Sequence, residues 1–426
     1  MSTQEKVVER LGICVGGGPA PGINGVIAAV TIEAINNGLE VVGFIEGFKY
    51  LMAKDYTKFK TLKISDVSRI HFQGGSVLRT SRSNPTKNPV HLQNCVDVLS
   101  ELNVKYLVTI GGDDTAFSSM SIAKAADNKI KVCHVPKTID NDLPLPNGIP
   151  TFGYQTAREV GTNILRNLSE DAKTAGRFFI VVAMGRNAGH LALGIGKSAG
   201  AQLTIIPEEF HGSKITFNRV CDIIESTVIK RLAKGKDHGV VVLAEGLLEH
   251  MDQEDLITMF GQENVKLDPH GHILLAELDF GKQIRDELRS RASKRGISVN
   301  FTEKNLGYEL RCAPPNAYDR EYTRDLGYGA VSYLLSGRSG ALISFQGTSM
   351  VPMDFEDIKD PKTGKARVRM VDCDSEGFKV AVKYMIRLSA KDFNNPQKLQ
   401  ILAQAGKTTE EEFKKQFEYL VHSEAH

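Results

Sequence analysis

The chain alternates short runs of apolar, often β-branched residues with longer stretches in which apolar residues recur every three or four positions. Short apolar runs predict buried strands, and the longer spacing predicts amphipathic helices. In the first third of the chain this pattern predicts strands at 11–15, 40–45, 106–110 and 131–135, and helices at 22–37, 90–102 and 116–127. Such an alternation is typical of an α/β fold built on a parallel sheet.

The same alternation returns further along the chain. It predicts strands at 178–183, 203–206 and 239–244, and helices at 156–172, 189–199 and 217–233. Segments such as FFIVVAM and GVVVLA are apolar throughout, so strands made from them need helices on both faces. We predict an α/β fold of two doubly wound, Rossmann-like lobes with parallel central sheets and an active site in the cleft between them.

The pattern divides the chain into the ranges 1–150, 151–278, 279–345 and 346–426. The third range holds a helix rich in basic residues, a motif-rich loop at 307–319 and a second helix, and we expect it to return to the first lobe. The last range is more polar and ends in a charged amphipathic helix at 409–421. We expect this C-terminal extension to pack on the surface.

Composition excludes several classes of protein. The 426 residues are 41% hydrophobic, and 53 basic against 51 acidic side chains give a net charge of +2, which offers no strong field for nucleic acid or an anionic membrane. No apolar run is long enough to span a bilayer, and the first residues lack the apolar core of a signal peptide, so we expect a cytoplasmic location. The six cysteines are widely spaced without a CxxC pair, and we interpret them as reduced core residues.

Unusual sequences follow six of the predicted strands. They are GGGPAPG, GGDDT, PKTIDND, MGRNAG, PEE and EG. Ligands of open parallel sheets bind beyond the carboxyl ends of the strands, so these loops are expected to share one site. GGGPAPG leads into a helix, where bare backbone N–H groups suit a phosphate. It matches neither a Walker A loop nor the GxGxxG fingerprint, so Glu46 at the end of the next strand does not indicate a nicotinamide site.

Carboxylates gather in two of these loops, at Asp113, Asp114, Asp140 and Asp142. Burying so much like charge requires a cation, and hard oxygen ligands beside a phosphate favour Mg²⁺. The alternative, two Asp-rich turns exposed to water, is a poor match for loops that follow fully apolar strands. Phosphoryl transfer to a hydroxyl needs a metal, a positioned base and cations. The candidate cations are Arg82, Lys137, Arg177 and Arg186.

Together with GGSVLRTSR, GYELRCAPP and YDREY, these motifs occur in an order and at intervals that resemble the 6-phosphofructokinase family over residues 12–344. The resemblance implies phosphorylation of fructose 6-phosphate at C1, in glycolysis or gluconeogenesis. It implies a donor and Mg²⁺ lobe at 1–150, a sugar-phosphate lobe at 151–278 and a segment at 279–345 that completes the cleft. It implies no nucleic-acid or membrane partner. A kinase for a related sugar phosphate, such as sedoheptulose 7-phosphate, stays open.

The resemblance also implies roles for single residues. Asp140 matches the general base at the C1 hydroxyl, flanked by Thr138 and Asp142. The implied donor-binding residues are Gly17, Arg82, Gly112, Asp113 and Lys137, of which Asp113 is the Mg²⁺ ligand. The implied sugar-binding residues are Met184, Gly185, Arg186, Glu245, Tyr308 and Arg311. Arg177 matches an arginine that reaches a neighbouring subunit, which implies a homodimer or homotetramer.

The chain departs from the family's ATP-using pattern at two positions. Asp114 and Lys137 both stand where that pattern has glycine. The Asp114 carboxylate would repel the α-phosphate of ATP, and the Lys137 ammonium would oppose the leaving phosphate. The pair is similar to the pyrophosphate-dependent branch, whose reaction is expected to be reversible, and it adds both residues to the catalytic set.

ATP is the alternative donor, because Lys137 by itself also occurs in ATP-using relatives. A catalytically inactive sugar-phosphate sensor is a further alternative, and the presence of Asp113 and Asp140 argues against it. Another departure lies on the sugar side, where Thr302 stands in place of a family arginine and Lys304 is the candidate substitute.

Overall fold

The computed structural model describes residues 8–127, 129–261, 278–361 and 367–422. The chain forms two compact units, each made of two separate stretches of sequence. We call Met1–Ala157 with Tyr308–Arg369 the first lobe, and Arg158–Gly307 with Met370–His426 the second lobe. The expected range 279–345 is thus shared, because its first part belongs to the second lobe and its remainder returns to the first.

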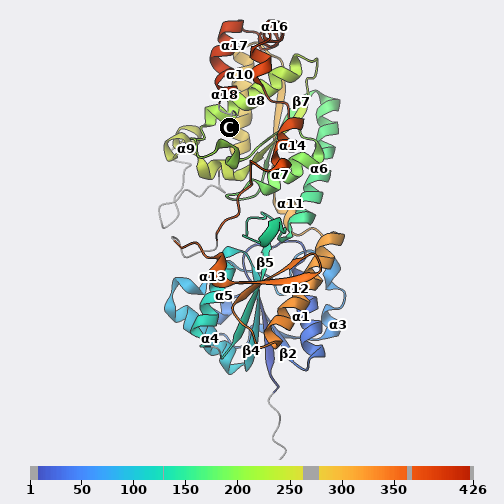
Figure 1. Cartoon of the computed structure of the whole chain (residues 1–426), viewed down its shortest axis with the longest axis vertical. Coiled ribbons are helices and arrows are strands. Elements are labelled where there is room, and N and C mark those ends of the chain that lie inside the picture. Colours follow the sequence, from blue (N-terminus) through green and yellow to red (C-terminus); the bar gives the residue numbers. More distant parts are fainter. Residues whose placement is uncertain (1–7, 128, 262–277, 362–366, 423–426) are drawn as a thin grey trace, which may run out of the picture. The chain divides into compact units, whose positions relative to one another are not determined.

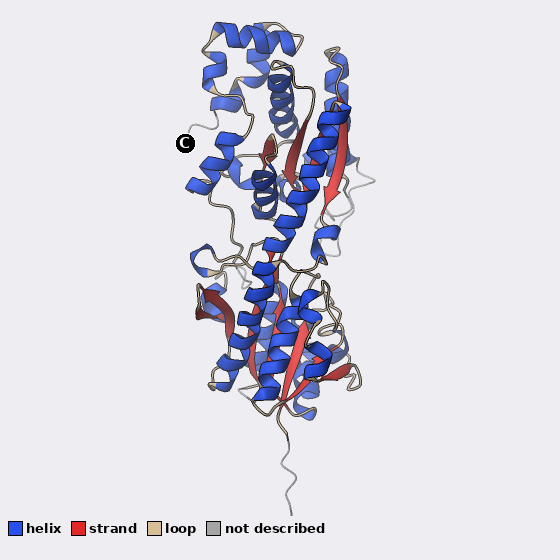
Figure 2. Ribbon diagram, turned by 90° about the vertical axis from the view of Figure 1, so that its right-hand side faces the viewer, coloured by secondary structure: helices blue, strands red, loops and turns tan. Residues whose placement is uncertain are grey.

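The first lobe is built on one mixed sheet (Figure 2). Its strand order is β12-β11-β5-β4-β1-β2-β3, and β6 (Phe152–Gly153) pairs with the end of β5. Besides β6, which is parallel to β5, five of these strands run parallel to one another: β1 (Arg10–Val15), β2 (Glu40–Phe44), β4 (Val104–Gly111), β5 (Lys131–Thr138) and β11 (Ala341–Gln346). The edge strands β3 (Phe59–Leu62) and β12 (Ser349–Asp354) are antiparallel to their neighbours.

Helices cover both faces of this sheet, as its apolar strands require (Figure 1). On one face α1 (Ile23–Asn36) packs closely along α12 (Ala317–Leu335), and their apolar side chains form a core with β1, β5 and β11. On the other face α4 (Pro89–Glu101) and α5 (Asp113–Ala125) enclose a second core with β1, β2 and β4. The predicted doubly wound lobe is confirmed.

The second lobe has a smaller, wholly parallel sheet in the order β10-β7-β9-β8. The strands are β7 (Arg177–Ala183), β8 (Leu203–Ile205), β9 (Gly239–Ala244) and β10 (Asn300–Leu306). Helices α8 (Phe217–Leu232) and α10 (Phe280–Lys294) share an apolar core with this sheet. Helix α7 (His190–Ala199) lies against β8 and β9, and α6 (Tyr154–Ala175) carries the chain in from the first lobe.

The C-terminal extension contributes to both lobes. Helices α16 (Pro396–Ala405), α17 (Glu410–Phe417) and α18 (Tyr419–His422) pack against Ile229 of α8 in the second lobe. The predicted helix at 409–421 is therefore broken into two. The remaining short helices are α2 (Lys49–Met52), α3 (Ile64–Val67), α9 (Gln253–Phe260), α11 (Tyr308–Arg311), α13 (Phe355–Ile358), α14 (Glu376–Tyr384) and α15 (Ala390–Phe393).

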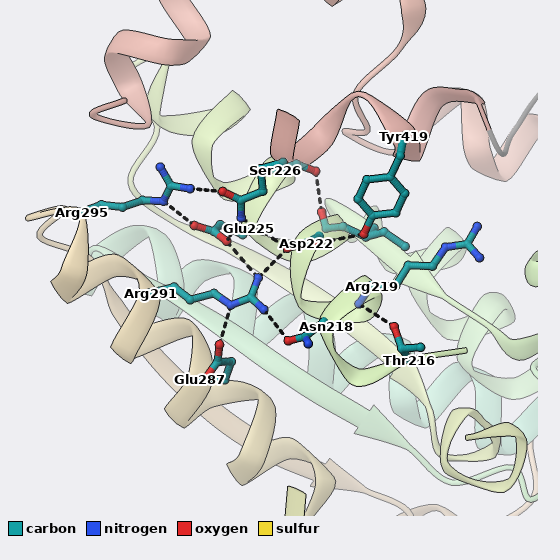
Figure 3. A network of polar contacts seen from close by, with 12 residues as sticks. Thr216, Asn218, Arg219, Asp222, Glu225, Ser226, Glu287, Arg291, Arg295 and Tyr419 are labelled. Carbon is teal, nitrogen blue, oxygen red and sulfur yellow. Dashed lines mark hydrogen bonds and ion pairs between the residues drawn. The ribbon is translucent and has the colours of Figure 1, made fainter. Parts of the chain in front are cut away.

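A network of ion pairs and hydrogen bonds joins the C-terminal helices to α8 and α10 of the second lobe (Figure 3). Arg291 of α10 lies 2.6 Å from Asp222 and 3.2 Å from Glu225, both on α8. From the extension, the hydroxyl of Tyr419 donates to Asp222 at 2.7 Å, and Gln416 donates to Glu225 at 3.2 Å. Arg291 is half-buried, so the cost of removing its charge from water offsets part of the attraction to the two carboxylates.

The extension also reaches the first lobe, which its polar sequence did not predict. Strand β12 adds an edge to the first sheet, and residues 367–369 then run beside the loop that follows β5. Its expected place on the surface is therefore only part of its role. In the part of the chain that the structure describes, no helix is long and apolar enough to cross a membrane.

One buried carboxylate joins the returning segment to the start of α6. Asp319 of α12 is fully buried and accepts hydrogen bonds from the backbone N–H groups of Gly153 at 2.9 Å and Thr156 at 2.8 Å. It also accepts from the Thr156 hydroxyl at 2.5 Å. The acceptor satisfies N–H groups that the first turn of α6 leaves without helical partners.

We predict that Asp319→Ala lowers the free energy of unfolding by about 1 to 3 kcal/mol, because buried donors lose their acceptor. Asp319→Asn should lose less, since its amide oxygen still accepts. Urea unfolding followed by circular dichroism measures both changes. Glu321→Ala, at an exposed position on the same helix, is the matched control. Equal midpoints for Asp319→Ala and Glu321→Ala would contradict the prediction.

Candidate active site

The glycine loop after β1 is held by its own backbone. The N–H of Gly16 donates to the carbonyl of Ile110 at 2.8 Å, and the N–H of Gly17 donates to that of Ser81 at 2.8 Å. The second bond places the loop beside the segment that carries the exposed Arg82. Gly17 has a φ of 79°, in the left-handed region that favours glycine. Gly17 and Arg82 of the predicted donor site are thus brought together.

Lys137 lies directly beneath this loop. It is only 4% exposed, near the end of β5, and its Nζ donates to the carbonyl of Gly18 at 2.5 Å. A Cβ atom on Gly17 would stand 3.2 Å from the same Nζ. Because the loop has no side chains at these glycines, the buried Lys137 ammonium can lie close to its backbone. An anion bound at this loop would therefore lie near a positive charge.

The GGDDT sequence forms the turn between β4 and α5. Gly112 is the N-cap of α5, and Asp113 and Asp114 occupy its first turn, with Asp113 half-buried and Asp114 exposed. The Thr115 side chain fills the space that Cβ atoms on Gly16 and Gly111 would need. These two glycines are therefore explained by packing, whereas Gly112 and Asp113 lie at a helix start, where an anion binds favourably.

The PKTIDND sequence forms a closed loop after β5. Thr138 Oγ1 accepts from the N–H of Asp140 at 3.0 Å, which turns the chain immediately before the predicted base. Thr151 donates from its N–H to Asn141 Oδ1 at 3.0 Å and from its hydroxyl to the carbonyl of Thr138 at 2.8 Å. Asp140 is buried and Asp142 is half-buried. The carboxylates of Asp140 and Asp142 therefore extend from a backbone that is fixed by hydrogen bonds within the loop.

Tyr308 and Arg311 belong to the first lobe, on the short helix α11. Tyr308 is 79% exposed, and the Arg311 guanidinium lies 5.7 Å from the centre of its ring. The guanidinium also occupies the position that a Cβ atom on Gly18 would take. The predicted sugar-phosphate residue Arg311 therefore rests against the glycine loop, together with the donor-side Lys137.

The second lobe brings the MGR sequence together with Glu245. Met184 donates its N–H to the carbonyl of Leu306 at 2.9 Å, and Gly185 donates its N–H to Glu245 Oε2 at 3.3 Å. Arg186 is exposed and has a φ of 42°, which is unusual for a residue with a side chain. Strained residues of this kind cluster at functional sites. Burial and the nearby Glu245 raise the pKa of Glu249, and Arg186 opposes this shift.

Two predicted sugar-side positions lie along strands of the second lobe. Arg177 begins β7, at the opposite end from Met184, and forms an ion pair with Asp171 at 3.5 Å. The structure therefore does not bring Arg177 to the MGR sequence. Thr302 and Lys304 are two residues apart on β10, so they lie on the same face of the sheet. Lys304 pairs with Val181 in the register, nearer the end that leads to Met184.

Among the described residues, no three His, Cys, Asp or Glu side chains converge as a metal-binding group. A divalent ion bound mainly by phosphate oxygens needs only one or two carboxylates from the protein. Asp113, half-buried beside Gly112, fits such a role.

His134 is a residue that sequence reasoning passed over. It is fully buried in β5; its Nε2 donates to the carbonyl of Gly111 at 3.0 Å, and its Nδ1 lies 2.8 Å from the Thr109 hydroxyl. The carbonyl can only accept, so Nε2 carries a proton, and burial lowers the pKa of the ring and keeps it neutral. It supports the turn that carries Asp113. Its place within an apolar strand is the only signal in the sequence, and that signal is also typical of packing.

A family model described as phosphofructokinase matches residues 10–334. The chain belongs to the phosphofructokinase family. The matched range contains all the motifs described above and the whole of both sheets except β11 and β12. The C-terminal extension lies outside it.

Two relatives match nearly the whole length of the chain. It is 64% identical over 423 residues to a pyrophosphate–fructose 6-phosphate 1-phosphotransferase of Naegleria fowleri, covering 98% of this chain and 97% of that protein. It is 50% identical over 414 residues to the protein of the same name from Thermotoga maritima, covering 96% of this chain and 98% of that protein. A solved pyrophosphate-dependent phosphofructokinase from Nitrosospira multiformis matches with a TM-score of 0.68 at 16% identity, over 88% of this chain and 90% of that one, which shows the shared fold.

We predict that His134 makes stability depend on pH. Burial, the larger cause, and the charge of Lys137 lower its pKa from 6.5 to about 3. Below pH 6.5 the unfolded chain binds a proton at this position that the folded chain excludes, so stability falls as pH falls. The slope due to His134 should approach about 1.4 kcal/mol per pH unit between pH 6 and 4.

Urea midpoints at pH 7, 6 and 5 test this prediction. His134→Gln should flatten the decline relative to the wild-type protein, because glutamine does not titrate. His250→Gln, at an exposed position, serves as the control. Parallel pH curves for the wild type and His134→Gln would contradict the prediction.

Proposed function

We propose that this phosphofructokinase-family protein transfers a phosphoryl group from pyrophosphate to the C1 hydroxyl of fructose 6-phosphate. The observation that carries the choice of donor is a pair of charged side chains. The Lys137 ammonium is buried at the carbonyl of Gly18, and the Asp114 carboxylate stands in the first turn of α5. The names of the two near full-length relatives support the same donor and sugar. The products are fructose 1,6-bisphosphate and phosphate, and the reaction is expected to run in both directions.

Asp140 acts as the general base in this proposal. Its carboxylate accepts the proton of the C1 hydroxyl while the oxygen attacks the phosphorus of pyrophosphate. Support comes from the braced loop, in which the Asp140 N–H is tied to Thr138 Oγ1 at 3.0 Å. The Asp140 carboxylate on such a loop keeps its orientation when the sugar binds, because the backbone of the loop does not have to reorganise.

Lys137 and Asp114 select the donor. The bond to the leaving phosphate breaks as negative charge builds on that phosphate, and the Lys137 ammonium stabilises this charge. The exposed Asp114 carboxylate stands in the first turn of α5, where it would repel the α-phosphate of a nucleotide. The backbone of Gly17 would line the donor, and the backbone N–H of Gly112 and the guanidinium of Arg82 would hold the remaining phosphate oxygens.

Mg²⁺ is the proposed metal, with Asp113 as its protein ligand. When bound, it would neutralise charge on the phosphate oxygens during transfer. The other ligands would be phosphate oxygens and water, as is usual for this ion.

The sugar side of the proposal draws on both lobes. Met184, Gly185, Arg186 and Glu245 come from the second lobe, and Thr138, Asp142, Tyr308 and Arg311 from the first. Glu245 already accepts from Gly185, and its carboxylate suits a sugar hydroxyl. Arg186 and Arg311 supply charge for the 6-phosphate. The cleft in which these residues would meet stays a prediction.

Arg177 is proposed to complete the site of a neighbouring subunit. It starts β7, and seven residues of strand span about 23 Å, so it is far from Met184 of its own chain. A homodimer or homotetramer is therefore part of the proposal.

We predict that the wild-type protein turns over fructose 6-phosphate faster with pyrophosphate than with ATP. Asp114→Gly should raise ATP-dependent turnover about 10- to 1,000-fold, because a charge clash of about 1 to 4 kcal/mol is removed. Lys137→Gly should cut pyrophosphate turnover heavily, because the leaving phosphate loses its counter-charge. Initial rates with each donor at saturating sugar measure these changes in the wild type, both single variants and the double variant.

Lys129→Gly is the matched control, since Lys129 is an exposed lysine in the turn before β5. It should leave the donor preference unchanged. Faster wild-type turnover with ATP than with pyrophosphate would refute the donor assignment, and the protein would then be an ATP-dependent enzyme.

We predict that two inactive variants restore activity when their subunits are mixed. Asp140→Ala should lower kcat by about two to four orders of magnitude, because the base is lost. Arg177→Ala should chiefly weaken sugar-phosphate binding. In a mixed oligomer, some sites would combine an intact Asp140 with an intact Arg177 from the neighbour. Rates after joint refolding and isolation of tagged mixed oligomers measure the recovery, and verified mixed oligomers without recovery would refute the shared site.

A further inference from the structure

Arg369, in the C-terminal extension, makes a fan of hydrogen bonds to the loop that carries Asp140. Its Nε donates to the carbonyl of Asn141 at 3.0 Å, and its Nη2 donates to the same carbonyl at 2.9 Å and to Asn141 Oδ1. Its Nη1 donates to the carbonyl of Ile149 at 2.8 Å, at the other end of the loop. Its backbone N–H also donates to the carbonyl of Asp142 at 2.7 Å.

These bonds act where the loop is strained. Asn141 has a φ of 58°, a left-handed conformation that costs a residue with a side chain of order 1 kcal/mol or more. Asn141 directly follows Asp140, so its backbone angles set the direction in which the Asp140 carboxylate leaves the chain. A guanidinium is planar and presents several donors at fixed angles, which suits it to hold two carbonyls of a loop at once. An ammonium has no such geometry.

We propose that Arg369 is a positioning residue that fixes the left-handed turn at Asn141 and thereby aims the Asp140 carboxylate at the sugar hydroxyl. This inference rests on the proposed function. In this proposal Arg369 acts on Asp140 through its hydrogen bonds to Asn141. The extension thus takes part in catalysis from outside the residues that the family model matches.

A purely structural role, anchoring the extension to the first lobe, is the competing explanation. The chain offers a matched control for it two residues earlier. Arg367 is exposed, and it donates from its side chain to the carbonyl of Asp357 and from its backbone to that of Ile358 at 2.8 Å. These contacts anchor the same segment to α13 and do not involve the Asp140 loop. If both arginines only anchor the extension, replacing either one should change kcat equally. If Arg369 positions Asp140, only its replacement should lower kcat.

The test combines kinetics with hydrogen exchange in the full-length protein. Arg369→Ala should lower kcat about 10- to 100-fold, because small displacements of a base are costly, while KM for each substrate stays within about three-fold. Arg367→Ala should stay within about two-fold of the wild type in both. Arg369→Lys should recover only part of the loss, because one ammonium cannot bind both carbonyls with the same geometry.

A double-mutant cycle of Arg369 and Asp140 distinguishes a positioning role of Arg369 from a general loss of structure. If Arg369 acts through Asp140, adding Arg369→Ala to Asp140→Ala should cause little further loss of kcat, since there is no base left to aim. A full additional loss in the double variant would overturn the proposal. So would a folded Arg369→Ala protein with kcat within two-fold of the wild type, or an equal loss in Arg367→Ala.

Hydrogen exchange gives a readout that needs no activity. Peptides spanning 139–149 should exchange about 10-fold or more faster in Arg369→Ala than in the wild type or Arg367→Ala, while peptides from α4 stay unchanged. Unchanged exchange in 139–149 would overturn the proposal. If the wild type uses ATP and not pyrophosphate, the proposed donor fails, and the same kinetic comparison with ATP still decides the role of Arg369.

Discussion

The contact between the Lys137 ammonium and the carbonyl of Gly18 is the interaction on which the rest of the site depends. A nearly buried ammonium is costly unless polar groups surround it, so the glycine loop must bring its backbone close. A Cβ atom on Gly18 would overlap the Arg311 guanidinium, and one on Gly17 would stand 3.2 Å from Lys137 Nζ on a backbone with a left-handed φ. Gly17 and Gly18 thus lie against two cations, whereas Gly16 is required by packing against Thr115. A loop that contacts two cations suits an anionic donor.

The sheet of the first lobe makes this arrangement possible. Parallel neighbours β1, β4 and β5 end at the same edge, so the glycine loop, the GGDDT turn and the PKTIDND loop emerge side by side. Beneath them, the neutral ring of His134 ties β5 to the end of β4. The returning helix α12 seals one face and uses Asp319 to fix the start of α6. Two fully buried polar side chains, His134 and Asp319, thus connect the sheet and helices to the segments around the site.

In the second lobe, too, neighbouring parallel strands bring the loops at their carboxyl ends together, but the residues in these loops differ. The ends of β7 and β9 place the MGR sequence next to Glu245, and β10 lies beside β7 with Lys304 on one face. The carboxylates of Asp222 and Glu225, which pair with Arg291, also accept hydrogen bonds from the C-terminal helices. These carboxylates belong to α8 and not to the loops at the strand ends. The extension is therefore a structural part of both lobes.

The sequence by itself determined the order and type of most central strands and helices, because apolar runs and helical spacing are local properties. It did not predict β10 or the buried strand β11. It also marked the loops at the strand ends, since glycine and aspartate clusters directly after buried strands are unusual. Short edge strands such as β3 and β12 were missed because half-exposed strands lack a continuous apolar run. Only the tertiary structure set Arg311 against Gly18, placed His134 under the GGDDT turn and brought Arg369 to Asn141. Those contacts join residues far apart in the chain, and no local pattern records which carbonyl a distant guanidinium or imidazole will reach.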